Sequence, residues 1–368
     1  MIRIRAPGRI NLFGEHQDYL NYPIIAMAIS KYIYLEAKKV SKPFFSIELS
    51  DLNERFEIKL NNKELEYFSK RDYLRSAYNH YIRKGFRFHS GYNIKITGDI
   101  PVNAGAASSS ALVIAWLFFL NSINKNHKKL NKYQLSLMGY DTEVIEFKEH
   151  GGWMDHFTSV YGNLIYLEPK NDGPEVIHKS LNLDGFVLGN SLEKKETVED
   201  LFKVKEITKK AFIEIKKIMS NFNQYRTSLE EVKKFLPNLK KEYQKKIIGN
   251  IINRNLTIKA KKLIFNSFFD EKYNNNKLRN NFYVKLGNLL NEHHYQLKEN
   301  IEISTDKIEK MISNCLELGA LGAKINGSGF GGTMFAFFPN NEDRLVESIE
   351  KIGGEAFKIE TSNGVEIY

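Results

Sequence analysis

Apolar and polar residues alternate along the first part of the chain in a pattern that predicts short β-strands. Ile2, Ile4 and Ala6 alternate with arginines and predict an edge strand that breaks at Pro7 and Gly8. Runs rich in β-branched and aromatic residues predict further strands at residues 32–36, 45–49, 55–58 and 92–97. The opening part of the chain is therefore expected to form a sheet.

Helical spacing enters at two places in this first half. In residues 72–84 apolar side chains recur every three or four positions, as on one face of a helix. Residues 110–120 are apolar almost throughout, which is typical of a helix buried on all sides. The pattern also predicts a short helix at 143–147 and strands at 163–167 and 186–188.

The pattern of apolar and polar residues changes in the second half of the chain. Residues 197 to about 317 have mostly helical spacing, and the Asn-rich residues 273–281 predict a loop. The end of the chain returns to strands, predicted at residues 323–326, 333–338 and 357–360. We therefore expect two domains, residues 1–180 and 181–368.

Composition and charge exclude several classes of protein. The longest apolar run, residues 111–120, is about half of the ~20 residues that a membrane helix needs, so we expect neither a membrane segment nor a membrane partner. Arg3, Arg5 and Arg9 interrupt any apolar leader. The single cysteine, Cys315, does not suit a disulfide-stapled secreted domain. We expect a cytoplasmic protein.

The net charge of +10 raises the question of nucleic acid. The excess lies in Lys-rich helical segments, residues 203–217 and 233–246, where acidic residues are interleaved. A solvated helix face explains such a pattern, and we expect no nucleic-acid partner. A site for a triphosphate is also compatible with a basic protein.

A first candidate site joins a predicted strand to the apolar helix. Small residues allow a ligand to approach the backbone, and a helix start presents free N–H groups with a partial positive charge, which together favour an anion. Ser108, Ser109 and Ser110 add hydroxyls, although one serine would suffice as an ordinary N-cap. The residues of this segment that we predict to form the phosphate site are Pro101, Ala104, Gly105, Ala106, Ala107, Ser108, Ser109 and Ser110.

A second candidate is the glycine-rich run with Gly327, Gly329, Gly331 and Gly332. It fits the string G-x-G-x-x-G, but a dinucleotide fingerprint needs a helix after it, and here a strand follows. We predict a turn between two strands. The turn is either a plain hairpin loop or one kept small so that another group can approach.

Two polar segments offer candidate chemistry. Asp155 follows the glycines Gly151 and Gly152, and Glu143 lies upstream. One carboxylate near a phosphate loop can act as a base towards a hydroxyl, and another can hold magnesium, although an Asp beside a turn is often only solvated. Residues 8–19 contain polar groups suited to a polyol, namely Arg9, Glu15, His16 and Asp18.

These segments, in this order, resemble the GHMP kinases, and most closely the galactokinases among them. Residues 8–19 resemble the signature G-R-x-N-x-x-G-E-H-T-D-Y, and residues 101–112 resemble the phosphate loop P-x-G-x-G-L-x-S-S-A. Residues 291–297 are similar to N-E-S-H-x-x-L, and residues 324–332 are similar to K-x-T-G-A-G-F-G-G. The chain has neither a Walker lysine motif nor the protein-kinase motifs.

The resemblance implies an α+β fold with two domains. The N-terminal α/β domain would be of the ribosomal-protein type, with a left-handed crossover, and would carry the phosphate loop and the catalytic Asp. The C-terminal domain would have a ferredoxin-like core with the glycine-rich third motif. Sugar and ATP would meet between them, in a monomer or a homodimer.

The resemblance also implies a reaction and its residues. ATP, with Mg²⁺, would phosphorylate a monosaccharide hydroxyl, with galactose at its anomeric position as the first candidate. Asp155 would take the hydroxyl proton and Arg9 would neutralise charge at the reacting phosphate. Mg²⁺ would be held by Glu143 and Ser109, or by Ser108 in place of Ser109. The sugar would contact Glu15, His16, Asp18 and Gly152.

Several departures leave the substrate open. Gln17 replaces the threonine of the first signature, Asn103 replaces a phosphate-loop glycine, and only Asn190 and Ser191 remain of the stretch N-S-x-x-x-H-x-L. No tyrosine follows that stretch before Tyr225. Another aldose or a uronic acid is therefore an alternative substrate, and a sensor that binds ATP and sugar without turnover is an alternative function.

Overall fold

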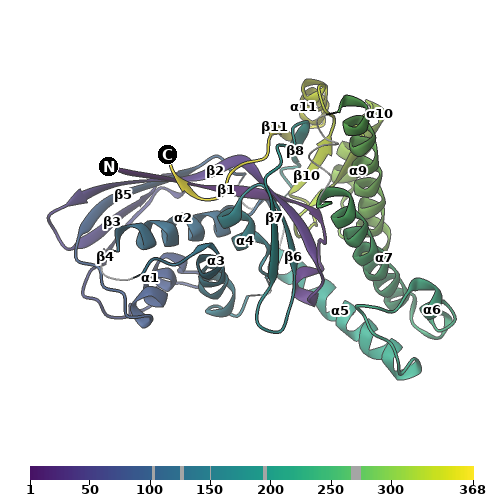
Figure 1. The fold of residues 1–368 in the computed structure, drawn as a ribbon, viewed down its shortest axis with the longest axis horizontal. Helices are drawn as coiled ribbons and strands as arrows, with labels where there is room; N and C mark the ends of the chain where they lie inside the picture. Colours follow the sequence, from purple (N-terminus) through teal and green to yellow (C-terminus); the bar gives the residue numbers. More distant parts are fainter. Residues whose placement is uncertain (102–103, 125–127, 150, 194–196, 267–274) are drawn as a thin grey trace.

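The structure is a computed structural model that describes residues 1–101, 104–124, 128–149, 151–193, 197–266 and 275–368. Two sheets organise it, with a layer of helices against each (Figure 1). In the described part of the chain, no helix is both long enough and apolar enough to span a bilayer.

The first sheet has the order β12-β1-β2-β5-β3-β4, and β2 also pairs with β6, which pairs with β7. Its pairs are antiparallel except for β3 with β5, which are parallel. The strands are β1 (Ile2–Phe13), β2 (Ile24–Val40), β3 (Phe44–Leu49), β4 (Glu54–Lys59), β5 (Gly91–Gly98), β6 (Leu164–Glu168), β7 (Glu175–Lys179) and β12 (Glu366–Ile367).

The predicted end of the first strand at Pro7 and Gly8 is wrong, because β1 continues to Phe13. The register with β2 shifts between Pro7 and Arg9, so a bulge accommodates the proline within the pairing. The strand is also not at an edge, since β12 pairs with its other side. The continuation matters because it carries Arg9 and Asn11 towards the centre of the molecule.

Four helices pack on one side of this sheet: α1 (Tyr73–Arg83), α2 (Ser108–Ile123), α3 (Lys132–Tyr140) and α4 (Met154–Tyr161) (Figure 1). The predicted helices at 72–84 and 110–120 are confirmed as α1 and α2. Asp72 caps α1 by accepting from the Arg75 N–H at 3.4 Å. Trp116 and Phe119 of α2 are fully buried between the sheet and the other helices, as an all-apolar helix requires.

The second sheet has the order β11-β8-β10-β9 with every pair antiparallel. Helices connect β8 to β9 and β10 to β11, which is the ferredoxin-like β-α-β-β-α-β arrangement implied by the resemblance. The strands are β8 (Phe186–Asn190), β9 (Gly322–Asn326), β10 (Thr333–Phe337) and β11 (Glu355–Ile359). The helices are α5 (Thr197–Ile218), α6 (Leu229–Lys233), α7 (Lys241–Ile264), α9 (Asn276–Gln296), α10 (Asp306–Glu317) and α11 (Glu342–Lys351).

The helical character of the second half is confirmed, but two local predictions fail. The predicted loop at 273–281 is wrong from residue 276 onwards, because Asn275 caps α9 by accepting from the N–H of Lys277 at 3.0 Å. Residues 273 and 274 lie outside the described residues. The helix α11 was not predicted, although Leu345 and Ile349 stand four positions apart and are both buried.

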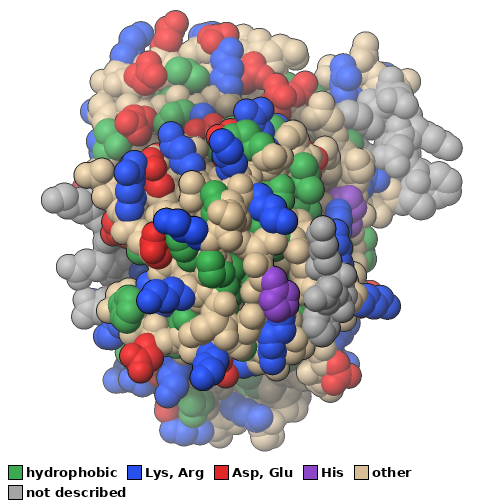
Figure 2. Space-filling model, turned by 90° about the vertical axis from the view of Figure 1, so that its left-hand side faces the viewer, with side chains coloured by type: hydrophobic (Ala, Val, Ile, Leu, Met, Phe, Trp, Pro, Cys, Tyr) green, Lys and Arg blue, Asp and Glu red, His purple; other side chains and the backbone are tan. Residues whose placement is uncertain are grey.

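The division at residue 180 stays a prediction. The last strand of the first sheet, β7, ends at Lys179, and β8 opens the second sheet at Phe186. The C-terminal strand β12 nevertheless returns to pair with β1. On the face shown in Figure 2, Lys and Arg are scattered among acidic and uncharged side chains, which is typical of a solvated surface.

Candidate active site

A cavity of about 1160 Å³ lies beside the start of α2. Segments far apart in the sequence line it: β1 and the turn after it, the β3–β4 hairpin, the loop before α1, the start of α2, parts of residues 143–149 and 151–156, and the β9–β10 turn. The polar lining includes Arg9, Glu15, His16, Asp18, Glu143 and Asp155, and the apolar lining includes Ile33, Leu49, Phe56, Phe68, Ile96 and Leu112. A cavity of this size suits a nucleotide with a second small ligand.

Arg9 and Asp155, predicted as the charge-neutralising and proton-accepting pair, face each other in this cavity. Arg9 of β1 donates from Nε to Asp155 Oδ1 at 2.8 Å and from Nη2 to Oδ2 at 3.0 Å. Its Nη1 donates to the carbonyl oxygen of Gly105. The Arg9 side chain is 6% exposed and that of Asp155 is 27% exposed. A two-point pair therefore fixes a carboxylate that still faces the cavity.

The phosphate-loop segment lies where the sequence predicts it. Pro101, Gly105, Ala107, Ser108, Ser109 and Ser110 line the cavity, whereas the side chains of Ala104 and Ala106 are buried below it. The alternative of an ordinary serine N-cap is wrong, because the N-cap of α2 is Ala107, with φ +64°, and no side-chain cap is seen among the described residues. The first N–H groups of α2 are therefore free to bind an anion.

The β9–β10 turn holds the phosphate loop from the other sheet. Asn326 Nδ2 donates to the carbonyl of Gly105 at 3.0 Å, and Thr333 Oγ1 donates to the carbonyl of Ala104 at 2.8 Å. A Cβ on Gly327 would lie 2.7 Å from the Gly105 oxygen, so only a glycine allows this approach. The glycine-rich segment is a turn between two strands, as predicted, and it supports the phosphate loop.

The rest of the glycine-rich turn faces other parts of the protein. Gly329 packs against Ile303 and Gly331 packs against Glu193. The carbonyl of Gly332 accepts from the Ser191 N–H at 2.7 Å. Of this turn, Gly327 and Ser328 line the cavity.

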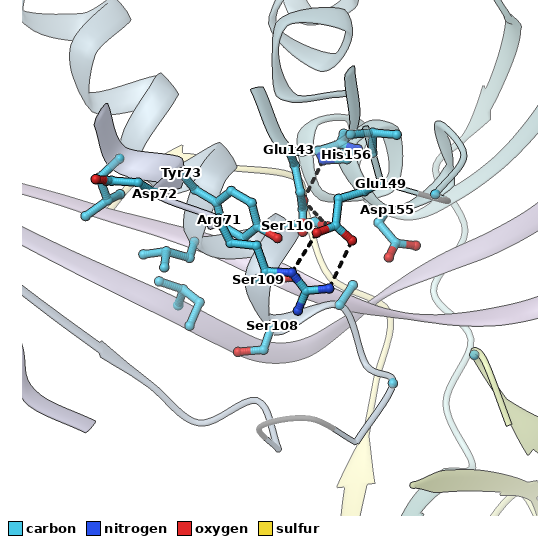
Figure 3. A pocket seen from close by; sticks show the side chains of 18 of the residues that line it. Arg71, Asp72, Tyr73, Ser108, Ser109, Ser110, Glu143, Glu149, Asp155 and His156 are labelled. Atoms are coloured by element: carbon cyan, nitrogen blue, oxygen red, sulfur yellow. Dashed lines mark hydrogen bonds and ion pairs between the residues drawn. The ribbon is translucent and has the colours of Figure 1, made fainter. Parts of the chain in front are cut away.

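The carboxylate of Glu143 lies near the start of α2, where Ser110 and His156 contact it. Ser110 Oγ donates to Glu143 Oε2 at 2.7 Å, and His156 Nε2 contacts the same oxygen at 2.7 Å (Figure 3). Burial opposes ionisation of Glu143, but hydrogen bonds from His156, Ser110 and Ser109 outweigh it and lower the pKa of the carboxyl. Figure 3 shows Ser108 pointing away from Glu143. We predicted no role for His156 from the sequence, although it directly follows Asp155.

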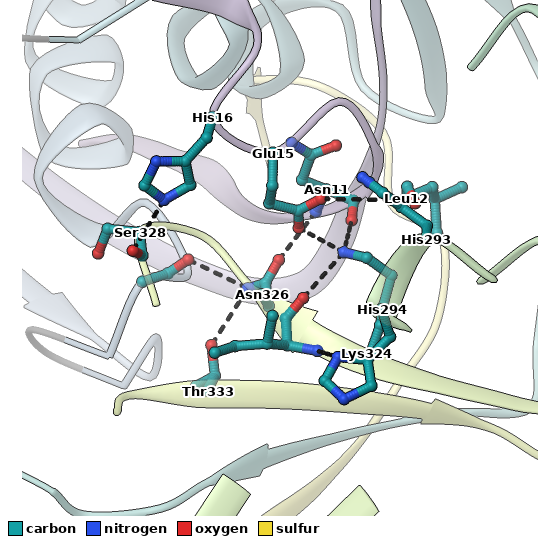
Figure 4. A network of polar contacts seen from close by, with 12 residues as sticks. Asn11, Leu12, Glu15, His16, His293, His294, Lys324, Asn326, Ser328 and Thr333 are labelled. Atoms are coloured by element: carbon teal, nitrogen blue, oxygen red, sulfur yellow. Dashed lines mark hydrogen bonds and ion pairs between the residues drawn. The ribbon is translucent and has the colours of Figure 1, made fainter. Parts of the chain in front are cut away.

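The carboxylate of Glu15 belongs to a buried network between the two sheets (Figure 4). Lys324 of β9 donates to Glu15 Oε1, to the Asn11 carbonyl at 3.0 Å and to the Ile325 carbonyl at 2.8 Å. Burial raises the pKa of Glu15 and lowers that of Lys324 to about 8, while each partner's charge opposes the shift. Among the described residues Glu15 Oε2 has no hydrogen-bond partner. We gave Lys324 no role from the sequence, although it begins the third motif.

His16 links the first signature to the glycine-rich turn. Its Nε2 lies 2.9 Å from the Ser328 carbonyl (Figure 4). Its Nδ1 lies 2.7 Å from the Tyr19 hydroxyl. A carbonyl only accepts, so Nε2 carries the proton and Nδ1 accepts from Tyr19 when the ring is neutral. His16 therefore connects the turn after β1, which carries Asp18, to the glycine-rich turn between β9 and β10.

Asp18 lies against Gly152, which brings two predicted sugar-binding residues together. A Cβ on Gly152 would clash with the Asp18 carboxylate, so a glycine is required at this contact. Burial and then the nearby charge of Asp155 raise the pKa of Asp18 to about 6. Lys205 of α5 opposes that shift, and its Nζ lies 5.3 Å from the ring centre of Tyr19. The sequence pattern placed Lys205 on a solvated helix face and offered no signal for this position.

A second cavity, of about 300 Å³, adjoins the first at Asp18 and Gly152. Its lining also contains Tyr19, Tyr140, Lys148, Glu149, Trp153 and Lys205. Glu149 is a further lining residue of both cavities, and it forms an ion pair with Arg71 (Figure 3).

Asn190, which is retained from the galactokinase pattern, and Tyr225, the first tyrosine after it, both lie in the described part of the fold. Asn190 ends β8, and its Oδ1 accepts from the Leu192 N–H at 3.2 Å. Tyr225 packs edge-on against Tyr22, with ring centres 5.5 Å apart. Asn103 and residues 195–196 lie outside the described residues.

Three sequence families match the chain. The N-terminal domain of GHMP kinases matches residues 72–163, the C-terminal domain of GHMP kinases matches residues 276–355, and the galactose-binding signature of galactokinases matches residues 2–39. The first match contains the phosphate loop, the second contains the glycine-rich turn, and the third contains the first signature.

Curated relatives match along nearly the whole chain. A galactokinase from Pyrococcus furiosus is 25% identical over 376 residues and covers 99% of each chain. A galactokinase from Thermococcus kodakarensis is 26% identical, with 98% of this chain and 94% of the relative covered. A mevalonate kinase from Pyrococcus furiosus is also 26% identical, with 97% and 95% covered.

Solved structures share the fold. Lactococcus lactis galactokinase complexed with galactose superimposes with a TM-score of 0.81 at 20% identity, covering 100% of this chain and 95% of that one. Methanococcus jannaschii mevalonate kinase superimposes with a TM-score of 0.71 at 20% identity, covering 98% of each. With both of its domains matched in sequence and its two-sheet fold shared with these enzymes, the chain belongs to the GHMP kinase family.

Proposed function

We propose that the protein is an ATP-dependent sugar kinase that phosphorylates galactose at its anomeric hydroxyl. The observation that carries this proposal is the Arg9–Asp155 pair, because Arg9 also contacts the phosphate loop through Gly105. Asp155, as the base, and Arg9, as the cation, are thereby held together between the proposed sugar pocket and the start of α2, where phosphate would bind. The match of residues 2–39 to the galactose-binding signature supports galactose as the acceptor.

The chemistry assigned to this pair is phosphoryl transfer. Asp155 accepts the proton of the sugar hydroxyl as that oxygen bonds to the γ-phosphorus of ATP. The bond between the γ-phosphorus and the oxygen bridging to the β-phosphate breaks, and ADP leaves. Arg9 lies beside the reacting group and neutralises charge that spreads over the transferred phosphoryl. Positioning and charge neutralisation supply most of the catalysis in such reactions.

The residues near α2 fit a magnesium ion bound together with nucleotide phosphates. Mg²⁺ takes oxygen ligands and commonly uses only one or two protein groups beside phosphate and water. Glu143 has a lowered pKa and lies next to Ser109 and Ser110, so it offers a carboxylate in the charged form. We propose that Glu143 and Ser109 hold the ion, which would neutralise phosphate charge.

The sugar would lie against Asp18, His16 and Gly152. Asp18 offers a carboxylate acceptor in both cavities, and Gly152 leaves room beside it. Glu15 also lines the cavity, but its carboxylate is buried, with Oε1 paired to Lys324 and Oε2 3.8 Å from His293 Nδ1, so it would support the sugar pocket from behind.

A coupled ADP-release assay over a panel of aldoses, uronic acids, mevalonate and homoserine, with Mg²⁺ and ATP, tests the proposal. Strong turnover with galactose alone is the expected result. Turnover with mevalonate or homoserine alone contradicts the sugar assignment. Silence across the panel together with retained ATP binding contradicts the enzyme and favours a sensor.

A uronic acid is a second candidate substrate because of Lys205. This lysine lines the cavity that adjoins Asp18 and Gly152, and the charge of Asp18 acts on it. The ammonium group of Lys205 would pair with the carboxylate of a uronic acid, whereas galactose has no carboxylate to pair with it.

The variant Lys205→Met separates the two substrates. For a uronic-acid kinase we expect a loss of about tenfold or more in kcat/KM with galacturonic acid, since a charge-assisted hydrogen bond disappears. For a galactokinase, kcat/KM with galactose stays within about threefold of the parent protein. Equal losses with both sugars would rule out Lys205 as the residue that distinguishes them.

A further inference from the structure

Arg71 and Glu149 form an ion pair that the proposed chemistry does not use. Arg71 Nε donates to Glu149 Oε1 at 2.7 Å, and Nη2 donates to Oε2 at 2.9 Å. Arg71 belongs to the loop before α1 and Glu149 to the loop before α4, and both residues line the main cavity. The side chain of Arg71 is 47% exposed and that of Glu149 is 22% exposed. The pair therefore joins two loops at a wall that a ligand can reach.

The guanidinium of Arg71 points towards the anion site. Figure 3 shows it between Glu149 and the first turn of α2, beside Ser109. The negative charges of Glu149 and Glu143 both raise the pKa of Arg71, with the Glu149 hydrogen bond as the larger cause. Glu143 is the carboxylate that we assign to Mg²⁺. A triphosphate bound at the start of α2 would thus come within reach of Arg71.

A nucleoside triphosphate would compete with Glu149 for this arginine. A half-exposed ion pair contributes little net stability, whereas arginine forms strong two-point hydrogen bonds with phosphate oxygens. The carboxylate of Glu149 would at the same time repel the phosphates. The two partners of one ion pair would therefore have opposite effects on nucleotide binding.

We propose that Arg71 is a phosphate-binding residue of the nucleotide site, held by Glu149 until a nucleoside triphosphate takes its place. The inference rests on the proposed ATP site. It assigns to Arg71 a role in positioning the nucleotide and to Glu149 a role in weakening nucleotide binding. A purely structural ion pair would instead make both residues favourable to binding or neutral.

Calorimetric titration with Mg²⁺ and the non-hydrolysable analogue adenylyl imidodiphosphate tests this inference, with adenosine as the phosphate-free probe. We expect Arg71→Ala to raise Kd for the analogue by about tenfold or more, because a charge-assisted contact is lost. We expect Glu149→Gln to lower it by about threefold, because a competitor and a repelling charge are removed. Adenosine binding changes in neither variant.

Arg83 and Glu146 provide a matched control. Arg83 is the last residue of α1 and forms a two-point pair with Glu146, at 2.8 and 2.9 Å, outside the cavity lining. Arg83→Ala and Glu146→Gln should leave both Kd values unchanged. Thermal unfolding of each variant without ligand verifies that it is folded.

The outcomes distinguish this inference from the proposed function. If the parent protein fails to bind the analogue, the ATP site itself is wrong and the inference falls with it. If the parent binds but Arg71→Ala and Glu149→Gln shift Kd in the same direction, or Arg71→Ala leaves it unchanged, only the inference is overturned. A matching change in adenosine binding would also overturn it, because it would place the effect on the loops and not on the phosphates.

Discussion

Two carboxylate–cation pairs stand next to each other in the centre of the protein, and they differ in their access to water. Asp155 with Arg9 lies in the cavity wall, and 27% of the Asp155 side chain is exposed. Glu15 with Lys324 lies behind it, with side chains 1% and 0% exposed. The first pair joins β1, and the second joins the turn after β1, to a distant segment. Only the first has a carboxylate that a bound sugar and its proton can reach.

Burial determines what each pair can do. For Glu15 and Lys324, removal from water pushes both groups towards their neutral forms, so each depends on the other to stay charged. For Asp155 and Arg9, a two-point pair leaves the carboxylate open to the cavity on one side. The exposed pair is therefore suited to chemistry and the buried pair to holding the two sheets together.

Removing the cation of the buried pair should give the largest effect on stability. Lys324→Met leaves Glu15 buried without its partner, and we expect the free energy of unfolding to fall by about 3–5 kcal/mol. Urea denaturation followed by circular dichroism measures the loss. The double variant Glu15→Gln with Lys324→Met should recover most of it, and a double variant as unstable as the single one would contradict the ion-pair explanation.

Removing the charge of the exposed pair should affect turnover and leave stability nearly unchanged. We expect Asp155→Asn to lower kcat by about 100-fold or more, the usual contribution of a general base, with the Kd for ATP preserved. Steady-state kinetics and nucleotide titration measure the two quantities. Near-normal turnover would remove Asp155 from the base role, and a large loss of stability would erase the contrast between the pairs.

Asp18 is a third carboxylate of this region, and its raised pKa should make the stability of the protein depend on pH. Its pKa is about 6 in the folded protein and 3.8 as the reference value, so the folded state binds more protons between these pH values. Stability contributed by protonated Asp18 is therefore lost as pH rises from about 4 to about 6. Asp18→Asn should raise the melting temperature at pH 7 by a few degrees, with the gain vanishing near pH 4.

Melting curves of the parent and Asp18→Asn between pH 4 and pH 8 measure this difference. A gain that is independent of pH would show that the charge is not its cause. In the same variant we expect the sugar KM to rise more than the ATP KM. Equal rises would make Asp18 a structural residue of the turn after β1.

Much of the fold follows from local patterns. Alternation placed β3, β4 and β5 correctly, and helical spacing placed α1 and α2, since both signals depend on neighbours in the sequence. Local patterns failed where tertiary contacts overrule a residue's usual preference. Pro7 stays within β1 because a bulge and pairing on both sides hold it, and the Asn-rich start of α9 is helical because Asn275 caps it.

The sequence by itself determined the chemical inventory of the site: Arg9, Asp18, Glu143, Asp155, the serines of α2 and the glycine-rich turn, each recognised from its motif. Only the tertiary structure decided which of these groups meet. Lys324 reaches Glu15 across 309 positions, Thr333 holds Ala104 across 229, and Arg71 meets Glu149 across 78. Such contacts depend on how the two sheets and their loops pack, and no spacing between neighbouring residues encodes them.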